Sequence, residues 1–129
     1  MKTVYPAVLT PMEGGKWGVR VPDLPGCVTS GTSLPDAVEM AADAANLWLV
    51  SAEDSGDPIP SPRDPSTITH APGDVPTLVP VDTVTYRRRL DSHAVRKNVS
   101  LPSWMAVLAD QRGINCSQVL QDALRTMLD

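Results

Sequence analysis

The sequence predicts an α+β fold in two parts: a small β-β-β-α-β domain, then a short strand with two helices. Three observations lead to this class. The chain starts with period-two alternation of apolar residues, continues with one long helical pattern, and ends with a strand–helix–helix segment. We place the first domain at 1–82, with a proline-rich connection at 57–76, a short helix and hinge at 83–94, and the second domain at 95–129.

Three strands are predicted before the long helix. Residues 3–10 alternate between two faces, and Pro6 indicates a position at the edge of the sheet. A turn with two glycines leads to a return strand at 17–21, which completes a hairpin. A corner rich in proline and glycine at 22–26 then precedes a third strand at 27–31.

The long helix is predicted to begin at Thr32 or Ser33 as N-cap, with Pro35 in its first turn. Its apolar residues follow the helical i, i+3, i+4, i+7 pattern of a helix that lies on a sheet. These residues are Leu34, Ala37, Val38, Ala41, Ala45, Trp48 and Leu49. Because the helix stands between the third strand and a fourth at 77–81, we expect a right-handed crossover and parallel pairing.

The segment from 95 to 129 is predicted to be one half of a dimer. Residues 95–101 alternate as a strand, and Pro102 ends it. Two helices follow, with Gly113 as the C-cap of the first and Asn115 as the N-cap of the second. The second helix has a wide apolar face, formed by Val119, Leu120, Ala123, Leu124, Met127 and Leu128. About 35 residues bury too little apolar surface to fold alone. We therefore expect two copies to interlock and their strands to pair as an antiparallel ribbon.

The polar face of that ribbon suits DNA. Arg96, Asn98 and Ser100 lie on one side of the strand, and such side chains read base edges in the major groove. The alternative is that Arg96 and Asn98 only keep a dimerisation ribbon soluble. Free backbone N–H groups at the start of the second helix are candidate phosphate contacts. They belong to Asn115, Cys116 and Ser117.

This C-terminal pattern resembles the ribbon-helix-helix family of dimeric repressors. The matching strings are V-x-L-P at Val99–Pro102 and G-I-N-x-S-x-x-L at Gly113–Leu120. Lys97 departs from the family, which usually buries an apolar residue at that position. We expect Lys97 either to reach around to a DNA phosphate or to mark a strand whose start splays.

Charge is distributed unevenly along the chain, whose formal net charge is −4. Residues 1–82 contain four basic and eleven acidic residues, a net charge of −7, and residues 83–129 contain seven basic and four acidic residues, a net charge of +3. A basic tail suits a polyanion, and an acidic first domain suits a basic protein surface. The alternative is that both are simply solvated surfaces.

Composition also argues against membrane insertion and secretion. No run approaches the ~18 apolar residues of a membrane helix, and the N-terminal residues lack the features of a signal peptide. The two cysteines lie far apart in the sequence. We expect a cytoplasmic protein with reduced thiols and no membrane partner.

The sequence predicts no catalytic, metal or cofactor site. Two-metal hydrolysis needs converging carboxylates, but the first strand has none. Asp36, Glu39 and Asp43 follow one helix and read most simply as a solvated face. His70 and His93 have no cysteine or histidine at ligand spacing, so a zinc site is not expected. No nucleophile has an evident base. We expect a protein that is not an enzyme.

The first domain closely resembles the HicB antitoxin family. The string from Trp17 to Leu49 carries the resemblance, together with the helix exit and the join to the C-terminal tail. The matching segments are the PDLPGC corner at Pro22–Cys27, the lead-in at Gly31–Leu34, the exit at Asp57–Pro60 and the join at 81–102.

The resemblance implies an antitoxin of a HicA/HicB-type toxin–antitoxin system. HicB-like first domains adopt a partial ribonuclease-H-like fold and bind HicA, a small basic mRNA interferase with a catalytic histidine and a double-stranded-RNA-binding-domain-like fold. The C-terminal domain represses the shared operon. We therefore expect a homodimer or higher oligomer that binds a HicA-like toxin and operator DNA. The alternative is a solitary ribbon-helix-helix regulator whose first domain senses a ligand or only oligomerises.

The corner at 22–26 and the nearby tryptophan are the candidate toxin contacts. The residues in question are Trp17, Pro22, Asp23, Leu24 and Pro25. A purely structural reading competes with this one: the two prolines and Gly26 fix a tight turn, and Cys27 packs as a small apolar group.

Overall fold

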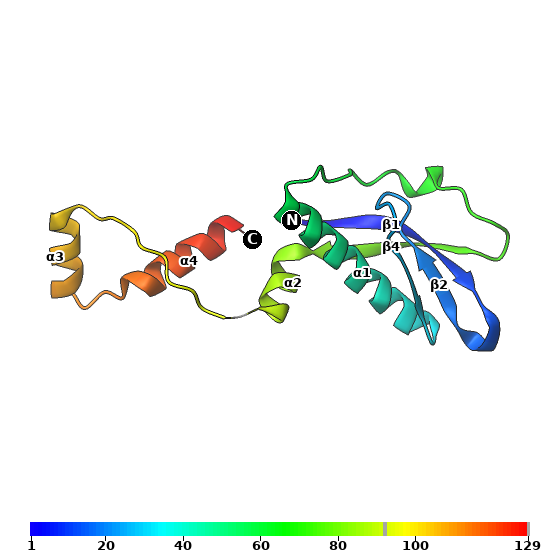
Figure 1. Cartoon of the computed structure of the whole chain (residues 1–129), viewed down its shortest axis with the longest axis horizontal. Helices are drawn as coiled ribbons and strands as arrows, with labels where there is room; N and C mark the ends of the chain where they lie inside the picture. Colours follow the sequence, from blue (N-terminus) through cyan, green and yellow to red (C-terminus); the bar gives the residue numbers. More distant parts are fainter. Residues whose placement is uncertain (92, 129) are drawn as a thin grey trace. The chain divides into compact units, whose positions relative to one another are not determined.

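The computed structural model describes residues 1–91 and 93–128 (Figure 1). The chain divides into two compact units, Met1–Leu90 and Asp91–Asp129. The first unit contains β1 (Lys2–Pro11), β2 (Trp17–Arg20), β3 (Val28–Gly31), α1 (Leu34–Ser55), β4 (Val75–Asp82) and α2 (Thr83–Leu90), with short 3-10 turns at Glu13–Gly15 and Pro65–Thr67. The second contains α3 (Ser103–Gln111) and α4 (Cys116–Leu128). The predicted α+β class is confirmed.

The sheet is antiparallel throughout, with the strand order β3-β2-β1-β4. The predicted parallel pairing of the fourth strand is therefore wrong. After α1 has carried the chain back along the sheet, the connection after Gly56 carries it along the sheet a second time (Figure 1). The chain consequently enters β4 from the end opposite to that predicted, and β4 runs antiparallel to β1.

The expectation that Pro6 marks an edge strand is also wrong, because β1 lies inside the sheet. Proline is tolerated here because β2 pairs only with Val8–Pro11 of β1, and Pro6 lies outside that ladder. The prolines of β4, Pro76 and Pro80, do lie on an edge strand, where a missing N–H costs no bond to a further strand.

The core forms where α1 packs on the sheet. The buried residues of α1 are mostly alanines, which let the helix axis approach the strands closely. They are Ala37, Ala41, Ala45, Leu49 and Ala52, and they face a cluster that includes Tyr5, Ala7, Leu9, Val19, Val79 and Val81. Four residues of the predicted apolar face are confirmed as buried: Ala37, Ala41, Ala45 and Leu49. Leu34, in the first turn, is exposed.

The long connection from α1 to β4 contains little regular structure but is held down by side chains. The Tyr5 hydroxyl donates to the Pro60 carbonyl at 2.6 Å, and Arg20 donates to the Thr69 carbonyl at 2.7 Å. Ile68 is buried. These contacts from β1 and β2 fix a segment that has only one short helical turn of its own.

The start of α1 approaches β3 so closely that only glycine fits at the end of the strand. A Cβ atom at Gly31 would lie 2.3 Å from the Ala37 nitrogen. Ser33, one of the two predicted N-caps, accepts from the Asp36 N–H at 3.2 Å, and the Asp36 carboxylate accepts from the Thr32 N–H at 2.8 Å. This reciprocal capping fixes the angle at which the helix leaves β3.

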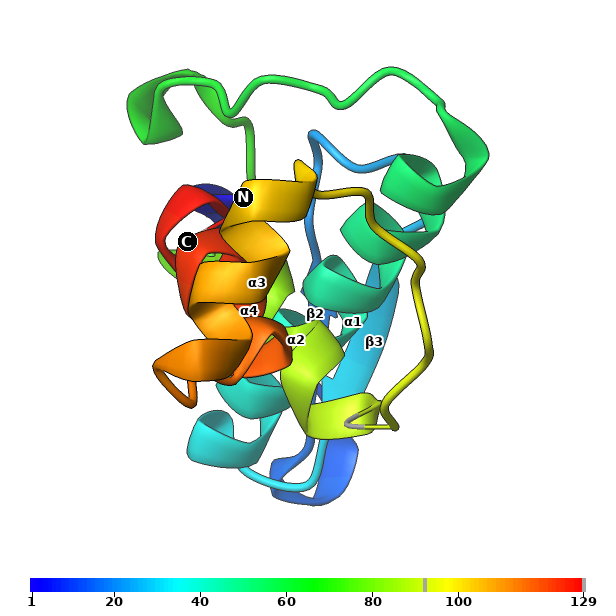
Figure 2. The ribbon, with the colours of Figure 1, turned by 90° about the vertical axis from the view of Figure 1, so that its left-hand side faces the viewer.

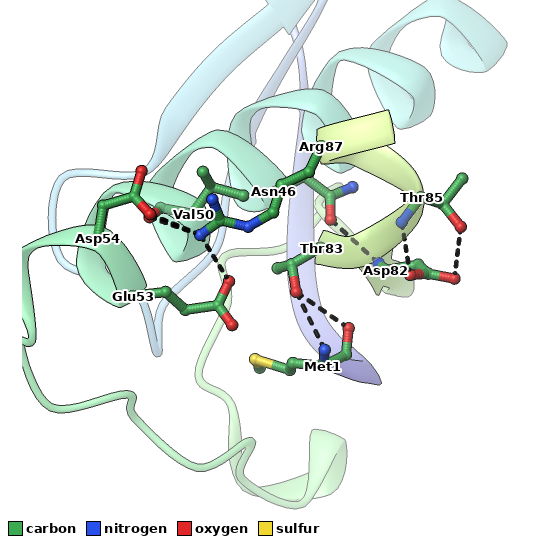
Figure 3. A network of polar contacts seen from close by, with 9 residues as sticks. All are labelled: Met1, Asn46, Val50, Glu53, Asp54, Asp82, Thr83, Thr85 and Arg87. Atoms are coloured by element: carbon green, nitrogen blue, oxygen red, sulfur yellow. Dashed lines mark hydrogen bonds and ion pairs between the residues drawn. The ribbon is translucent and has the colours of Figure 1, made fainter. Parts of the chain in front are cut away.

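α2 is docked on α1 by burial and by ion pairs (Figure 2). Thr83 and Tyr86 are buried, and Asp82 caps the helix by accepting from the Thr85 N–H at 3.0 Å and from its hydroxyl at 2.9 Å. Arg87 reaches Asp54 of α1 at 2.8 Å (Figure 3). The segment predicted as a short helix and hinge thus has a helix that is integral to the first unit.

The second unit has the helix boundaries that its sequence predicts. Gly113 has a φ of 64°, and the Ile114 N–H donates to the Ala109 carbonyl at 2.9 Å, which closes α3 with a Schellman turn. Asn115 caps α4 by accepting from the Gln118 N–H at 3.1 Å. Both predicted caps are confirmed.

The expected strand at 95–101 is not formed in the single chain, within the residues that the structure describes. A ribbon strand exists only when a second strand completes its hydrogen bonds, and one chain supplies no such partner. The ribbon and the ribonuclease-H-like detail of the first unit stay predictions.

We predict that Gly31→Ala destabilises the first unit by about 3 kcal/mol, because the new methyl group would have to displace the backbone of α1. Gly18→Ala is the matched control in the neighbouring strand. Its Cβ would meet the flexible Met12 sulfur at 3.3 Å and the Thr10 carbonyl only at 3.9 Å, so we expect a change within about 1 kcal/mol. Urea unfolding of both variants measures the difference. Equal midpoints would contradict the close packing.

We predict that the cap of α2 weakens in acid. The hydrogen bonds from the Thr85 N–H and hydroxyl lower the pKa of the Asp82 carboxyl. The pKa of Asp82 is lower in the folded state than in the unfolded state. The cap therefore contributes its full stabilisation of the fold above the ordinary aspartate pKa, and this contribution is lost as the pH falls through the folded-state pKa. NMR titration of Asp82 and of the Thr85 amide should show this. Asp82→Asn keeps an acceptor but cannot titrate, so its Thr85 amide should lose this response; an unshifted Asp82 pKa would refute the cap.

Candidate interaction surfaces

The corner at 22–26 is a turn closed by its own backbone. The Val21 N–H donates to the Cys27 carbonyl, the Leu24 N–H to Val21 and the Cys27 N–H to Leu24, each at 3.0 Å. Leu24 is only 1% exposed and belongs to the core. Burial raises the pKa of the Cys27 thiol, which therefore stays protonated. The structural role of the corner, one of the two readings of its sequence, is evident in these contacts.

Asp23 ties this corner to the long connection. Its side chain is 4% exposed, and it accepts from both the backbone N–H and the Nε of Arg63. Asp23 and Arg63 lie far apart in the sequence, so the sequence alone does not predict this contact. Asp23 also contributes, after burial, to the raised pKa of the Tyr5 hydroxyl.

The five candidate toxin contacts differ in how accessible they are. Pro25 is exposed, whereas Trp17 and Pro22 are half-buried and Leu24 is enclosed. The carbonyl of Pro25 accepts from the indole N–H of Trp48 at 2.9 Å, which joins the corner to α1. The role of these residues in toxin binding stays a prediction.

An open groove lies between this corner, the start of β3 and the C-terminal half of α1. Its volume is about 510 Å³, and its lining includes Val28, Leu47, Trp48 and Ser51. Val28 is 68% exposed and Leu47 52% exposed. We refer to it as the β3–α1 groove. The sequence signal for it is weak: Leu47 is an apolar residue of α1 that lies off the predicted core face.

The opposite flank of α1 is acidic and is partly neutralised by α2. Arg87 pairs with Asp54 at 2.8 Å and with Glu53 at 3.5 Å, and its hydrogen bond with Asp54 raises the pKa of the guanidinium (Figure 3). Arg89 lies 3.6 Å from Asp43 and stacks over the Tyr86 ring. Both arginines are exposed, and both pair with carboxylates of α1.

This docking redistributes the charge inferred from sequence. Because α2 belongs to the first unit, residues 1–90 contain seven basic and eleven acidic residues, and the net charge is −4. Residues 91–129 contain four of each, so their net charge is zero. The positive charge of the C-terminal half is therefore mainly that of α2. Attraction of the second unit to a polyanion depends on where its few basic residues lie.

The candidate DNA contacts of the second unit are all accessible. Arg96, Lys97, Asn98 and Ser100 are exposed in the segment that precedes α3. Cys116 and Ser117 are exposed at the start of α4. The side chain of Asn115 is already engaged as the cap of α4, so only its backbone is available to a phosphate.

The helices of the second unit leave their apolar residues uncovered. Among the residues described there, Ala109 alone is buried. The exposed apolar side chains include Trp104, Val107, Val119, Leu124, Met127 and Leu128. Large apolar side chains exposed in such number are typical of a surface that a partner covers.

Within residues 1–91 and 93–128, no three histidine, cysteine or acidic side chains gather closely enough to hold a metal ion. None of the helices in these ranges has the combination of length and apolarity that a bilayer span requires.

Comparison with known proteins identifies solved structures of similar fold. A chain of the toxin–antitoxin complex from Streptococcus pneumoniae matches with a TM-score of 0.63 and 21% identity, over 98% of this chain and 99% of its own. At that identity the likeness shows the fold alone. The crystal structure of the Burkholderia pseudomallei antitoxin HicB matches with a TM-score of 0.56 and 25% identity, over 98% and 99% of the two chains. A chain of the HicA3 and HicB3 toxin–antitoxin complex matches 62% of this chain and 99% of its own, with a TM-score of 0.53 and 26% identity.

A sequence-family comparison gives the assignment. No curated protein matched the chain. The family model described as a HicB-like antitoxin of bacterial toxin–antitoxin systems matches residues 5–121, which extend through the sheet, α1, α2, α3 and part of α4. The chain therefore belongs to the HicB-like antitoxins of bacterial toxin–antitoxin systems.

Proposed function

We propose that this chain neutralises a small basic ribonuclease toxin of the HicA type by direct binding, and that two copies repress their own operon through residues 95–129. The family match that runs through both units carries the proposal. Solved HicA3 and HicB3 molecules form a complex, which supports a partner of the same type here.

The first unit is suited to bind a basic protein by charge and shape. Its net charge is −4, and it offers an apolar groove beside the corner at 22–26. A toxin that binds RNA needs a positive surface, so an acidic inhibitor approaches that surface with long-range attraction and then excludes RNA by occupying it. The inhibition is steric and electrostatic and needs no catalytic group.

The second unit supplies the DNA-binding function only as a dimer. Its exposed apolar residues form a core when a second copy covers them, and the strands at 95–101 then pair. We propose that Arg96, Asn98 and Ser100 contact bases. Lys97 and the backbone N–H groups of Asn115, Cys116 and Ser117 contact phosphates. Because an mRNA-cutting toxin and an operator both act in the cytoplasm, we place the protein there.

The toxin prediction concerns a short reading frame for a basic protein, which we expect beside this gene. Expression of that protein alone should arrest growth, and co-expression of the antitoxin should restore it, with the two proteins co-purifying. The chain truncated after His93 retains Met1–Leu90, so it should still bind the toxin while failing to shift operator DNA. Absence of toxin binding by the full chain at micromolar concentration would refute the antitoxin proposal. Operator binding by the truncated chain would refute the division of labour.

The DNA prediction concerns Arg96. Arg96→Ala should lose about 1–3 kcal/mol of discrimination between the operator and unrelated DNA, because a bidentate contact to a base edge is lost. Arg125→Ala removes the same charge from α4, where Arg125 pairs with Asp122, and should leave discrimination unchanged. Gel-shift titrations at fixed salt with DNA from upstream of the gene measure both. Leu124→Asp should abolish both dimer and binding; specific binding by a monomeric variant would overturn the ribbon.

A further inference from the structure

We infer that the toxin docks in the β3–α1 groove, with an apolar side chain against Leu47 and Val28 and basic side chains around it. The inference rests on the proposed function and specifies where on the first unit it is performed. The groove is open, and the two apolar side chains at its walls are 52% and 68% exposed. Both lie on regular elements, α1 and β3, so a partner meets a preformed surface.

Charge distinguishes this groove from the other hollows of the first unit. One of about 380 Å³ lies beside α2, and another of about 590 Å³ lies along the acidic flank of α1; Arg89 lines both. In the part of the chain that the structure describes, the β3–α1 groove has no basic residue in its lining, and its one charged residue is Asp57. Lys2 and Arg89 line the first of these hollows, and Arg89 lies beside the carboxylates of the second. Of the three hollows, the β3–α1 groove is the one that presents a basic partner with no cation in its lining.

The sheet edge next to the groove favours the same surface. β3 is the last strand of the sheet, and its four residues, Val28–Gly31, include no proline. The other edge strand, β4, carries Pro76 and Pro80, which cannot donate hydrogen bonds to an added strand. A partner seated against Val28 can therefore extend its contact along the backbone of β3.

A second copy of this chain is the less suitable occupant. Each first unit has a net charge of −4, so two such units brought together at this groove repel one another. A basic toxin has the opposite charge. An apolar groove whose one charged lining residue is acidic, on a unit of net negative charge, suits a cationic protein.

The experiment compares two matched substitutions on one helix in the full chain. Leu47→Lys places a cation in the groove and should raise the Kd for the toxin that we expect to be encoded beside the gene by at least about tenfold. Met40→Lys makes the same change at a site that is 38% exposed and lines the hollow beside Arg89, and should change Kd by less than about threefold. Ser51→Arg, at another exposed groove position, should repeat the effect of Leu47→Lys. Circular dichroism checks that each variant folds.

Four outcomes of this experiment are informative. If the wild-type chain binds no toxin, the proposed function fails. If the wild type binds and both groove variants, Leu47→Lys and Ser51→Arg, bind equally well, the docking site is overturned and the function stands. If the groove variants keep toxin affinity but lose mass in sedimentation, the groove joins two copies of this chain and the inference is likewise overturned. Selective loss of toxin affinity in the groove variants supports it.

Discussion

The first unit depends on how closely α1 can approach the sheet. Alanines at the inner positions of the helix and a glycine at Gly31 remove the atoms that would otherwise hold the two layers apart. Two larger apolar residues of α1, Leu47 and Trp48, lie on a flank of the helix, where they line the groove. The acidic residues remain on the other flank, where Asp54 receives Arg87 from α2. One helix thus determines the core, the open groove and the docking of α2.

Local features of the chain were predictable because short-range chemistry fixes them. The helical spacing from Ala37 to Leu49, the N-cap at Ser33 and the caps at Gly113 and Asn115 each depend on neighbours within a few residues. The direction of β4 depends instead on a connection whose path is set by distant contacts such as Tyr5 with Pro60 and Asp23 with Arg63. No local pattern in the sequence predicts these pairs. The usual crossover rule therefore gave the wrong direction for β4.

The candidate surfaces were predictable to different degrees for the same reason. The alternation at 95–101 and the wide apolar face of α4 predict a dimer, because about 35 residues bury too little apolar surface by themselves. The charge argument needed the structure. Three arginines counted with the tail belong to the first unit, where Arg87 and Arg89 pair with α1. The groove was missed because Val28 and Leu47 come together only after β3 and α1 have packed.

The docking of α2 also bears on how the two activities are connected. With α2 folded on α1, only residues 91–94 separate the first unit from the predicted ribbon, a reach of at most about 14 Å. Each first unit, which is proposed to bind the toxin, is then tethered closely to the strand that is proposed to bind DNA. Release of the eight residues of α2 would roughly triple that tether and free arginines from α1 for another anion. Because the ion pairs are largely exposed, each contributes at most about 1 kcal/mol, and the burial of Tyr86 and Thr83 must supply most of the docking. The packing of two side chains thus controls how far apart the two functions can be held.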